Sequence, residues 1–180
     1  MRKFFWSLFE VVETVAVAVI AVILVRTFIA QPFLVSGSSM EPNFKDGDYL
    51  LVDELAYRFR EPVRGEVVVF KYPGDHKTYY IKRIIGLPGE RVVVKGESVV
   101  VYGVDGEKIE LKESYIREMS IQKDVDEKLS ENEFFVMGDN RDFSYDSRSW
   151  GALTRGDVTG VVKLRLWPFS SVDTFKPATY

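Results

Sequence analysis

Beyond Pro32 the chain is made of short runs of β-branched and aromatic residues, separated by glycine and proline. Runs of about four to eight such residues between turn residues are typical of strands. YPGD and LPGE are turn sequences, because proline presets one backbone dihedral and glycine permits a positive φ, and VVVKGESVVVYG predicts a hairpin. We therefore predict one mixed, mostly antiparallel β domain over residues 31–180. The strand-like runs are DYLLVDEL, GEVVVFKY, TYYIKRIIG, ERVVVKG, ESVVVYG, EFFVMG and DVTGVVKLRLWPF.

Two stretches of this domain lack the strand pattern. Residues 105–133 contain ten acidic and five basic residues with few aromatics, which is typical of a solvated segment with only local helix or strand. We expect this segment to be a surface excursion outside the core. The C-terminal stretch SSVDTFKPATY predicts a loose tail.

The first 30 residues differ in kind from the rest of the chain. The uncharged run Thr14–Val25 is too short to cross a bilayer, which needs about 20 residues, but the stretch Val11–Ala30 reaches that length as a helix. It must tolerate Glu13 and Arg26 near its ends, where long side chains can reach toward the headgroups. We predict a short cytoplasmic stub and a single transmembrane anchor helix over residues 1–30, and thus a bilayer as one partner.

Two other interpretations of this segment remain open. A cleaved signal peptide would carry small residues at its cleavage site, whereas Phe28 stands two places before Ala30. A buried helix in a soluble protein would need neighbours on all sides, which a small β-rich domain does not offer. Arg2 and Lys3 precede the segment, and this charge bias predicts a single pass through the plasma membrane, with the N-terminus cytoplasmic and the β domain extracytoplasmic.

Composition excludes several kinds of chemistry. The 180 residues carry a net charge of −3, which gives no general attraction to nucleic acid. The absence of cysteine excludes disulfides, thiol catalysis and cysteine-ligated metal, and a single histidine excludes a histidine-rich metal site. We expect no cofactor, no metal and no nucleic-acid partner, and we expect a monomer.

The stretch SGSSMEPNF, residues 36–44, groups three serines, one of which could be a nucleophile. His76 is the only histidine and lies beside a turn in YPGDHKT, where we expect an exposed loop residue, so lysine is the candidate base. A free lysine has a pKa of about 10.4, and keeping it neutral at pH 7 costs about 4.6 kcal/mol in water. Burial favours the neutral amine, so a catalytic lysine should lie on the inward face of an apolar strand.

Lys82, in TYYIKRIIG, meets this condition. Strand alternation places Lys82 and Arg83 on opposite faces, and we expect that only one of these two cations can easily be buried. The alternative is that Lys82 is an edge-strand charge that discourages aggregation. Lys71 and Lys163 also occur in strand-like runs, so the pattern is not unique.

Five motifs in order resemble a known family. SGSSMEPNF, GDYLLVDEL, RGEVVVF, YIKRIIGLPGE and GDNRDFSYDSRSWG occur in the order found in bacterial type I signal peptidases, and VRTFIAQPF is similar to that family's membrane-exit segment. The resemblance runs from about residue 20 to residue 169, and the small size is similar to the compact Gram-positive type. It implies a signal-peptidase-like antiparallel β fold and a membrane-anchored serine endopeptidase.

The resemblance also implies roles for individual residues. By position, Ser39 matches the nucleophile and Lys82 the general base of a Ser–Lys dyad that works through an acyl-enzyme. Ser144 matches a serine that helps to orient the lysine amine. Asp146 and Arg148 match residues that support the site, and we expect an ion pair between them whose role is more structural than chemical.

The family removes signal peptides from exported preproteins, cleaving after small residues at positions −1 and −3. An extended substrate can pair with a strand edge and offer alternate side chains to pockets, and bulky apolar walls would leave room only for small ones. Plain core packing is the alternative for each wall residue. The candidate substrate-binding residues are Phe33, Val35, Met40, Phe44, Tyr80 and Ile81.

The oxyanion that forms during cleavage needs hydrogen-bond donors, and the Ser39 backbone N–H is the obvious one. Some relatives add a serine hydroxyl two places before the nucleophile, but this chain has Gly37 there. Ser36 and Ser38 are alternative donors, although both are equally well explained as turn residues.

Two other functions compete with this one. A self-cleaving repressor-type Ser–Lys peptidase would carry a DNA-binding helix pair before its β domain, and this sequence shows a predicted anchor instead. A non-catalytic membrane-anchored binding module would be free to lose Ser39 or Lys82, and both are present.

Overall fold

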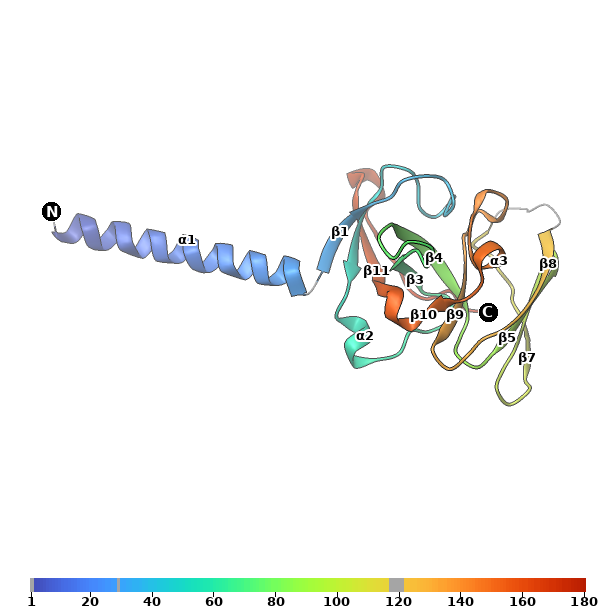
Figure 1. Ribbon diagram of the computed structural model, residues 1–180. Coiled ribbons are helices and arrows are strands. Elements are labelled where there is room, and N and C mark those ends of the chain that lie inside the picture. Colours follow the sequence, from blue (N-terminus) through green and yellow to red (C-terminus); the bar gives the residue numbers. More distant parts are fainter. Residues whose placement is uncertain (1, 29, 117–121) are drawn as a thin grey trace.

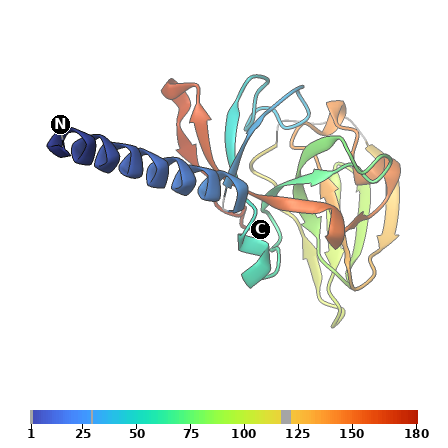
Figure 2. The same ribbon diagram turned by 60° about the vertical axis from the view of Figure 1, so that its left-hand side comes forward.

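The computed structural model describes residues 2–28, 30–116 and 122–180. The helix α1 (Arg2–Phe28) extends away from a body of antiparallel strands, as Figure 1 shows. The chain enters that body through β1 (Ala30–Leu34). The second view agrees with this arrangement (Figure 2).

The predicted transmembrane helix is not found. In the described part of the chain, no helix is both long enough and apolar enough to cross a membrane. The predicted span Val11–Ala30 also runs past the helix, which ends at Phe28, whereas Ala30 belongs to a strand.

A large sheet forms the centre of the body, and the predicted mostly antiparallel β fold is confirmed. In the described residues it has eight strands in the order β1-β2-β11-β3-β4-β9-β10, with β12 paired to β11. Their pairings are antiparallel. The strands after β1 are β2 (Tyr49–Asp53), β3 (Val67–Lys71), β4 (Tyr79–Gly86), β9 (Glu133–Met137), β10 (Leu153–Thr154), β11 (Val158–Trp167) and β12 (Asp173–Thr174).

A second sheet lies at the end of the body opposite α1 in both views (Figures 1 and 2). Its order is β7-β6-β5-β8, and its strands are β5 (Arg91–Gly96), β6 (Ser98–Tyr102), β7 (Lys108–Glu110) and β8 (Gln122–Lys128). The predicted hairpin is β5–β6. The charged segment 105–133 is therefore more ordered than expected, because β7 and β8 are the outer strands of this sheet; residues 117–121 of that segment lie outside the described residues.

Short helical turns complete the described chain. They connect strands near the ends of the large sheet, and two of them, η1 and α3, follow β9 closely. Their bounds are α2 (Ala56–Phe59), η1 (Arg141–Phe143), α3 (Ser147–Trp150), η2 (Arg155–Asp157) and η3 (Phe169–Ser171).

Valine-rich strands form the core because their alternate residues point inward. In the β5–β6 hairpin, Val92 faces Val101 and Val94 faces Val99 across the strands, and all four are buried. They pack with Ile85 of β4 and with Phe135 and Met137 of β9, so the two sheets share one apolar cluster. On the large sheet, β3 is apolar and buried from Val67 to Phe70, as expected for a central strand, and ends in the exposed Lys71.

The C-terminal stretch is not the loose tail that was predicted. β12 pairs with β11, and the ring of Phe175 lies 4.4 Å from that of Phe44. The Ala178 N–H donates to the Gly65 carbonyl at 3.1 Å. The Tyr180 and Tyr115 hydroxyls are 2.9 Å apart. The tail therefore packs along the body of the protein.

Candidate active site

Ser39 lies in the connection between β1 and β2, and hydrogen bonds fix this loop at both ends. The Gly37 N–H donates to the Asp46 carboxylate at 2.8 Å. Gly37 has φ +96, in the left-handed region where glycine is favoured. Beyond it, the Asn140 N–H donates to the Ser39 carbonyl and the Asn140 side-chain amide donates to the Ser38 carbonyl, both at 3.0 Å. The nucleophile candidate is thus held against the segment after β9.

Lys82 of β4 points at Ser39. Its amine donates to the Ser39 hydroxyl oxygen at 2.8 Å and to the Ile81 carbonyl at 2.9 Å. The Lys82 residue is only 4% exposed. Burial is the main cause that lowers the pKa of Lys82 from 10.5 to about 8; the Arg148 charge lowers it further, whereas Asp146 and Asp139 act in the opposite direction.

Arg83, the neighbour of Lys82, is also buried, so the expectation that only one of the two cations is buried is wrong. Arg83 is 6% exposed on the opposite side of β4. Its guanidinium donates two hydrogen bonds to the Asp139 carboxylate, at 2.6 and 2.8 Å, and one to the Gly65 carbonyl at 2.9 Å. It also lies 4.1 Å from the ring centre of Tyr115. A buried arginine is tolerated because each side of its fork has a partner.

Ser144 lies directly after η1 and close to Ser39. An added Cβ on Gly138 would be 2.2 Å from the Ser144 hydroxyl oxygen and 2.4 Å from the Ser39 carbonyl oxygen, so these groups crowd around Gly138. The Ser144 hydroxyl is buried and has no hydrogen-bond partner among the described residues. The expected hydrogen bond from Ser144 to the Lys82 amine is therefore not present, and an orienting role for Ser144 stays a prediction.

Asp146 and Arg148 form the expected ion pair, with 2.8 Å between the charged groups. The Asp146 carboxylate also accepts the Gly138 N–H at 2.9 Å. Arg148 donates to the Arg141 carbonyl at 2.8 Å. The pair thus ties the segment after β9 to the start of α3, and both of its charges act on the pKa of Lys82.

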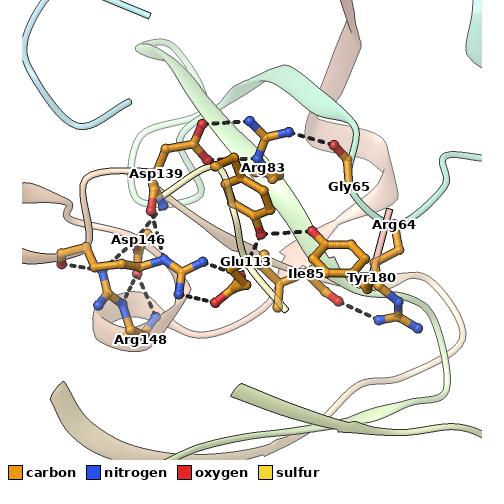
Figure 3. A network of polar contacts seen from close by, with 12 residues as sticks. Arg64, Gly65, Arg83, Ile85, Glu113, Asp139, Asp146, Arg148 and Tyr180 are labelled. Atoms are coloured by element: carbon orange, nitrogen blue, oxygen red, sulfur yellow. Dashed lines mark hydrogen bonds and ion pairs between the residues drawn. The ribbon is translucent and has the colours of Figure 1, made fainter. Parts of the chain in front are cut away.

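A wider network of buried charges surrounds this pair, as Figure 3 shows. Arg141 donates to the Glu113 carboxylate at 2.6 Å, and Tyr115 donates to the same carboxylate at 2.5 Å. Asn43 donates to Asp139 at 2.8 Å. None of these residues was predicted from the sequence, although Asp139, Asn140 and Arg141 stand within the stretch GDNRDFSYDSRSWG.

A cleft of about 470 Å³ opens at the dyad. Four of the six predicted substrate-binding residues line it: Phe33, Val35, Tyr80 and Ile81. The other two do not line it, because Met40 and Phe44 are buried in the apolar core behind the loop. Phe143 and Tyr145 also line the cleft and were not predicted, although both residues flank Ser144 in the stretch DFSYDSR.

His76 lies between β3 and β4 and does not line the cleft. The His76 side chain is 62% exposed, as predicted, and its Nδ1 lies 2.7 Å from the Asp157 carboxylate. Among the residues that the structure describes, no group of three or more His, Cys, Asp or Glu side chains is placed to hold a metal ion.

The sequence of the chain is similar to those of known proteins. Residues 8–167 match the family model "Signal peptidase, peptidase S26". A probable signal peptidase I-2 from Synechocystis sp. is 38% identical over 169 residues, covering 91% of this chain and 75% of that protein. A signal peptidase I from Bacillus licheniformis is 34% identical over 178 residues, covering 92% of each.

One solved structure is also similar. A signal peptidase I from Enterococcus faecalis is 28% identical and has a TM-score of 0.48, with 57% of this chain and 97% of that chain covered. This likeness is weak and adds nothing to the sequence comparisons. On the family match and the two sequence relatives, the chain belongs to the signal peptidase family, peptidase S26, and is a peptide hydrolase of that family.

Proposed function

We propose that this protein is a serine endopeptidase that removes N-terminal signal peptides from exported preproteins by means of a Ser39–Lys82 dyad. The single observation that carries the proposal is the 2.8 Å contact between the buried Lys82 amine and the Ser39 hydroxyl. Hydrogen-bond reach between nucleophile and base is the first requirement of this chemistry, and a suitable pKa is the second. A lysine whose pKa is about 8 supplies a useful fraction of neutral amine near neutral pH.

The first half of the reaction forms an acyl-enzyme. The Ser39 oxygen attacks the scissile carbonyl carbon while the neutral Lys82 amine takes the hydroxyl proton. We expect the Ser39 backbone N–H to donate to the resulting oxyanion. The carbon–nitrogen bond then breaks, and Lys82 returns its proton to the leaving amine.

The second half releases the signal peptide. Water attacks the ester carbon while Lys82 accepts one of the water protons, and the bond to the Ser39 oxygen breaks. The proton passes from Lys82 back to the Ser39 oxygen, so no net proton is gained or lost by the dyad. No metal or cofactor enters any of these steps.

The cleft suggests how the segment before the cut is selected. Phe33, Val35 and Ile81 are bulky apolar residues that line it. Side chains of this size leave little room, which favours substrates with small residues at positions −1 and −3. Ser144, Asp146 and Arg148 are proposed to support the dyad, with the Asp146–Arg148 pair holding Gly138 in place.

The test is cleavage of a preprotein that carries a small-x-small cleavage site by the purified full chain. The parent protein should cut after this site, whereas Ser39→Ala and Lys82→Ala should each lose the activity. Lys163→Ala is the matched control, because Lys163 is an exposed strand lysine. Normal cleavage by Lys82→Ala would reject the dyad, and binding without cleavage by the parent would favour a non-catalytic module.

A further inference from the structure

Two exposed aromatic side chains stand at the dyad without a role so far. Phe143 is 74% exposed and Tyr145 is 53% exposed, and they flank Ser144 in the chain. Both line the cleft that also contains Ser39 and Lys82. Large apolar side chains that stay exposed in a binding cleft offer surface that a ligand can cover.

Tyr145 is held by neighbours. Its hydroxyl lies 3.3 Å from the Tyr72 hydroxyl, and the two ring centres are 6.0 Å apart. Tyr72 stacks on Tyr80 with ring centres 4.9 Å apart, and Trp150 lies 6.1 Å from Tyr72. Trp150 in turn contacts the buried Phe70. Tyr145 is thus the outer member of an aromatic cluster that reaches the core, and its surface exists before substrate binds.

The chemistry of the dyad indicates which part of a substrate would meet this surface. The leaving amine receives its proton from Lys82, so the residue after the cut bond must lie next to the Lys82 amine. That amine is 5.5 Å from the ring centre of Tyr80, which belongs to the aromatic cluster.

Ile81 also lines the cleft, and it lies on the opposite face of β4 from Tyr80. Ile81, the neighbour of Tyr80 in β4, packs with Phe33 and Val35 against a different apolar cluster. Successive strand residues point to opposite faces. The apolar wall therefore suits the segment before the cut, and the aromatic wall suits the segment after it.

We propose that Tyr145 and Phe143 form the subsite for the first two residues after the cleaved bond, and that this subsite favours bulky apolar or aromatic side chains there. The substrate class is the start of the mature protein that the enzyme releases. This inference rests on the proposed peptidase function. Aromatic pairs contribute enough for a preference of about three- to tenfold over alanine.

The test uses peptides that are identical up to the cut bond and carry Ala or Phe at the first or the second position after it. All of them give the same acyl-enzyme, so differences in kcat/KM report the step in which the leaving segment is still bound. The parent should prefer Phe to Ala at one of these positions by about three- to tenfold. Tyr145→Ala and Phe143→Ala should each reduce the preference toward one, and Tyr145→Phe should keep it.

Two controls separate this subsite from a general structural effect. Phe59 is 84% exposed and is not a lining residue of the cleft, so Phe59→Ala should keep the full preference. Peptides that differ only at position −3 should be discriminated equally by the parent and by Tyr145→Ala. A disturbed fold would lower kcat/KM for all peptides alike and leave the ratios unchanged.

The outcomes distinguish the two proposals. If Ser39→Ala still cleaves the peptides, the proposed peptidase mechanism is wrong. If Ser39 is required but the parent shows no preference, or Tyr145→Ala and Phe143→Ala both keep it, the subsite is wrong and the peptidase function stands.

Discussion

Burial of the Lys82 amine gives the reaction a defined pH dependence. Burial lowers the pKa of Lys82 from 10.5 to about 8, and only the neutral amine can accept the Ser39 proton. We expect kcat/KM to fall about tenfold for each unit that the pH drops below about 8, and to level off above it. Measurement of kcat/KM against pH in well-buffered solutions of constant salt concentration checks this. A flat acid limb down to pH 6 would contradict a base role for Lys82.

Gly138 is the second residue for which the surrounding atoms predict the effect of a substitution. An added Cβ would lie 2.2 Å from the Ser144 oxygen and 2.4 Å from the Ser39 carbonyl oxygen, so the backbone on one side must move. We expect Gly138→Ala to lose roughly 1–3 kcal/mol of stability. We also expect the added Cβ to displace Ser39, and a displacement of about 1 Å there lowers kcat/KM about 100-fold.

Gly156→Ala is the matched control for this change. A Cβ at Gly156 meets no atom within 4 Å, and its backbone φ lies outside the left-handed region. Denaturant unfolding and cleavage rates of the two variants give the comparison. Equal stability and equal cleavage rates of the two variants would show that the segment after β9 accommodates the added Cβ of Gly138→Ala without loss.

At the scale of a single element, β4 carries a base on one face and a paired cation on the other. Arg83 and Asp139 are both buried, and each would leave an uncompensated charge if the other were removed. We expect Arg83→Met to cost about 3–5 kcal/mol of stability. Asp139→Asn should also be destabilising, while it retains an oxygen that can accept from Asn43.

The double variant separates pairing from mere loss of volume. Because the two groups share one interaction, the double variant should be clearly less destabilised than the sum of the single variants. Urea unfolding of the three variants and the parent measures this coupling. Strict additivity would show that the ion pair contributes nothing specific.

The same elements show how far the sequence alone could lead. The strand of Lys82 and the β5–β6 hairpin were predictable, because both are runs of β-branched and aromatic residues bounded by turn residues. β7 (KIE) and β8 (QKDVDEK) were missed since both are charged outer strands. The place of β8 also depends on pairing with β5, from which β6 and β7 separate it in the chain. The burial of Arg83 was misjudged because its partner Asp139 is 56 positions away.

For the site, local motifs identified the candidate dyad but only part of the surface around it. Ser39 and Lys82 stand in recognisable stretches. The sequence could not tell that Met40 and Phe44 pack into the core while Phe143 and Tyr145 line the cleft. Which apolar residue faces a cleft depends on the path of its loop, and no periodicity reports that path.

At the scale of the whole molecule, the C-terminal tail joins regions that are far apart in the sequence. Phe175 packs on Phe44 below the Ser39 loop, and Ala178 bonds to Gly65. Tyr180 meets Tyr115, whose ring lies against Arg83. The tail therefore contacts both the residues beneath the Ser39 loop and those around Arg83. None of its residues lines the cleft.

Truncation after Thr174 tests whether these contacts matter for the fold. The change removes two packed aromatic rings, Phe175 and Tyr180. It also removes three hydrogen bonds, to Lys163, Gly65 and Tyr115. We therefore expect a loss of about 2–4 kcal/mol. In a protein of this size that lowers Tm by roughly 5–15 °C. Cleavage at a temperature well below the new Tm should fall by less than the Ser39 and Lys82 variants, because the dyad itself is intact. Lys176→Ala is the control, since Lys176 is exposed within the same tail. An unchanged Tm in the truncated protein would mean that the tail lies on the body without stabilising it.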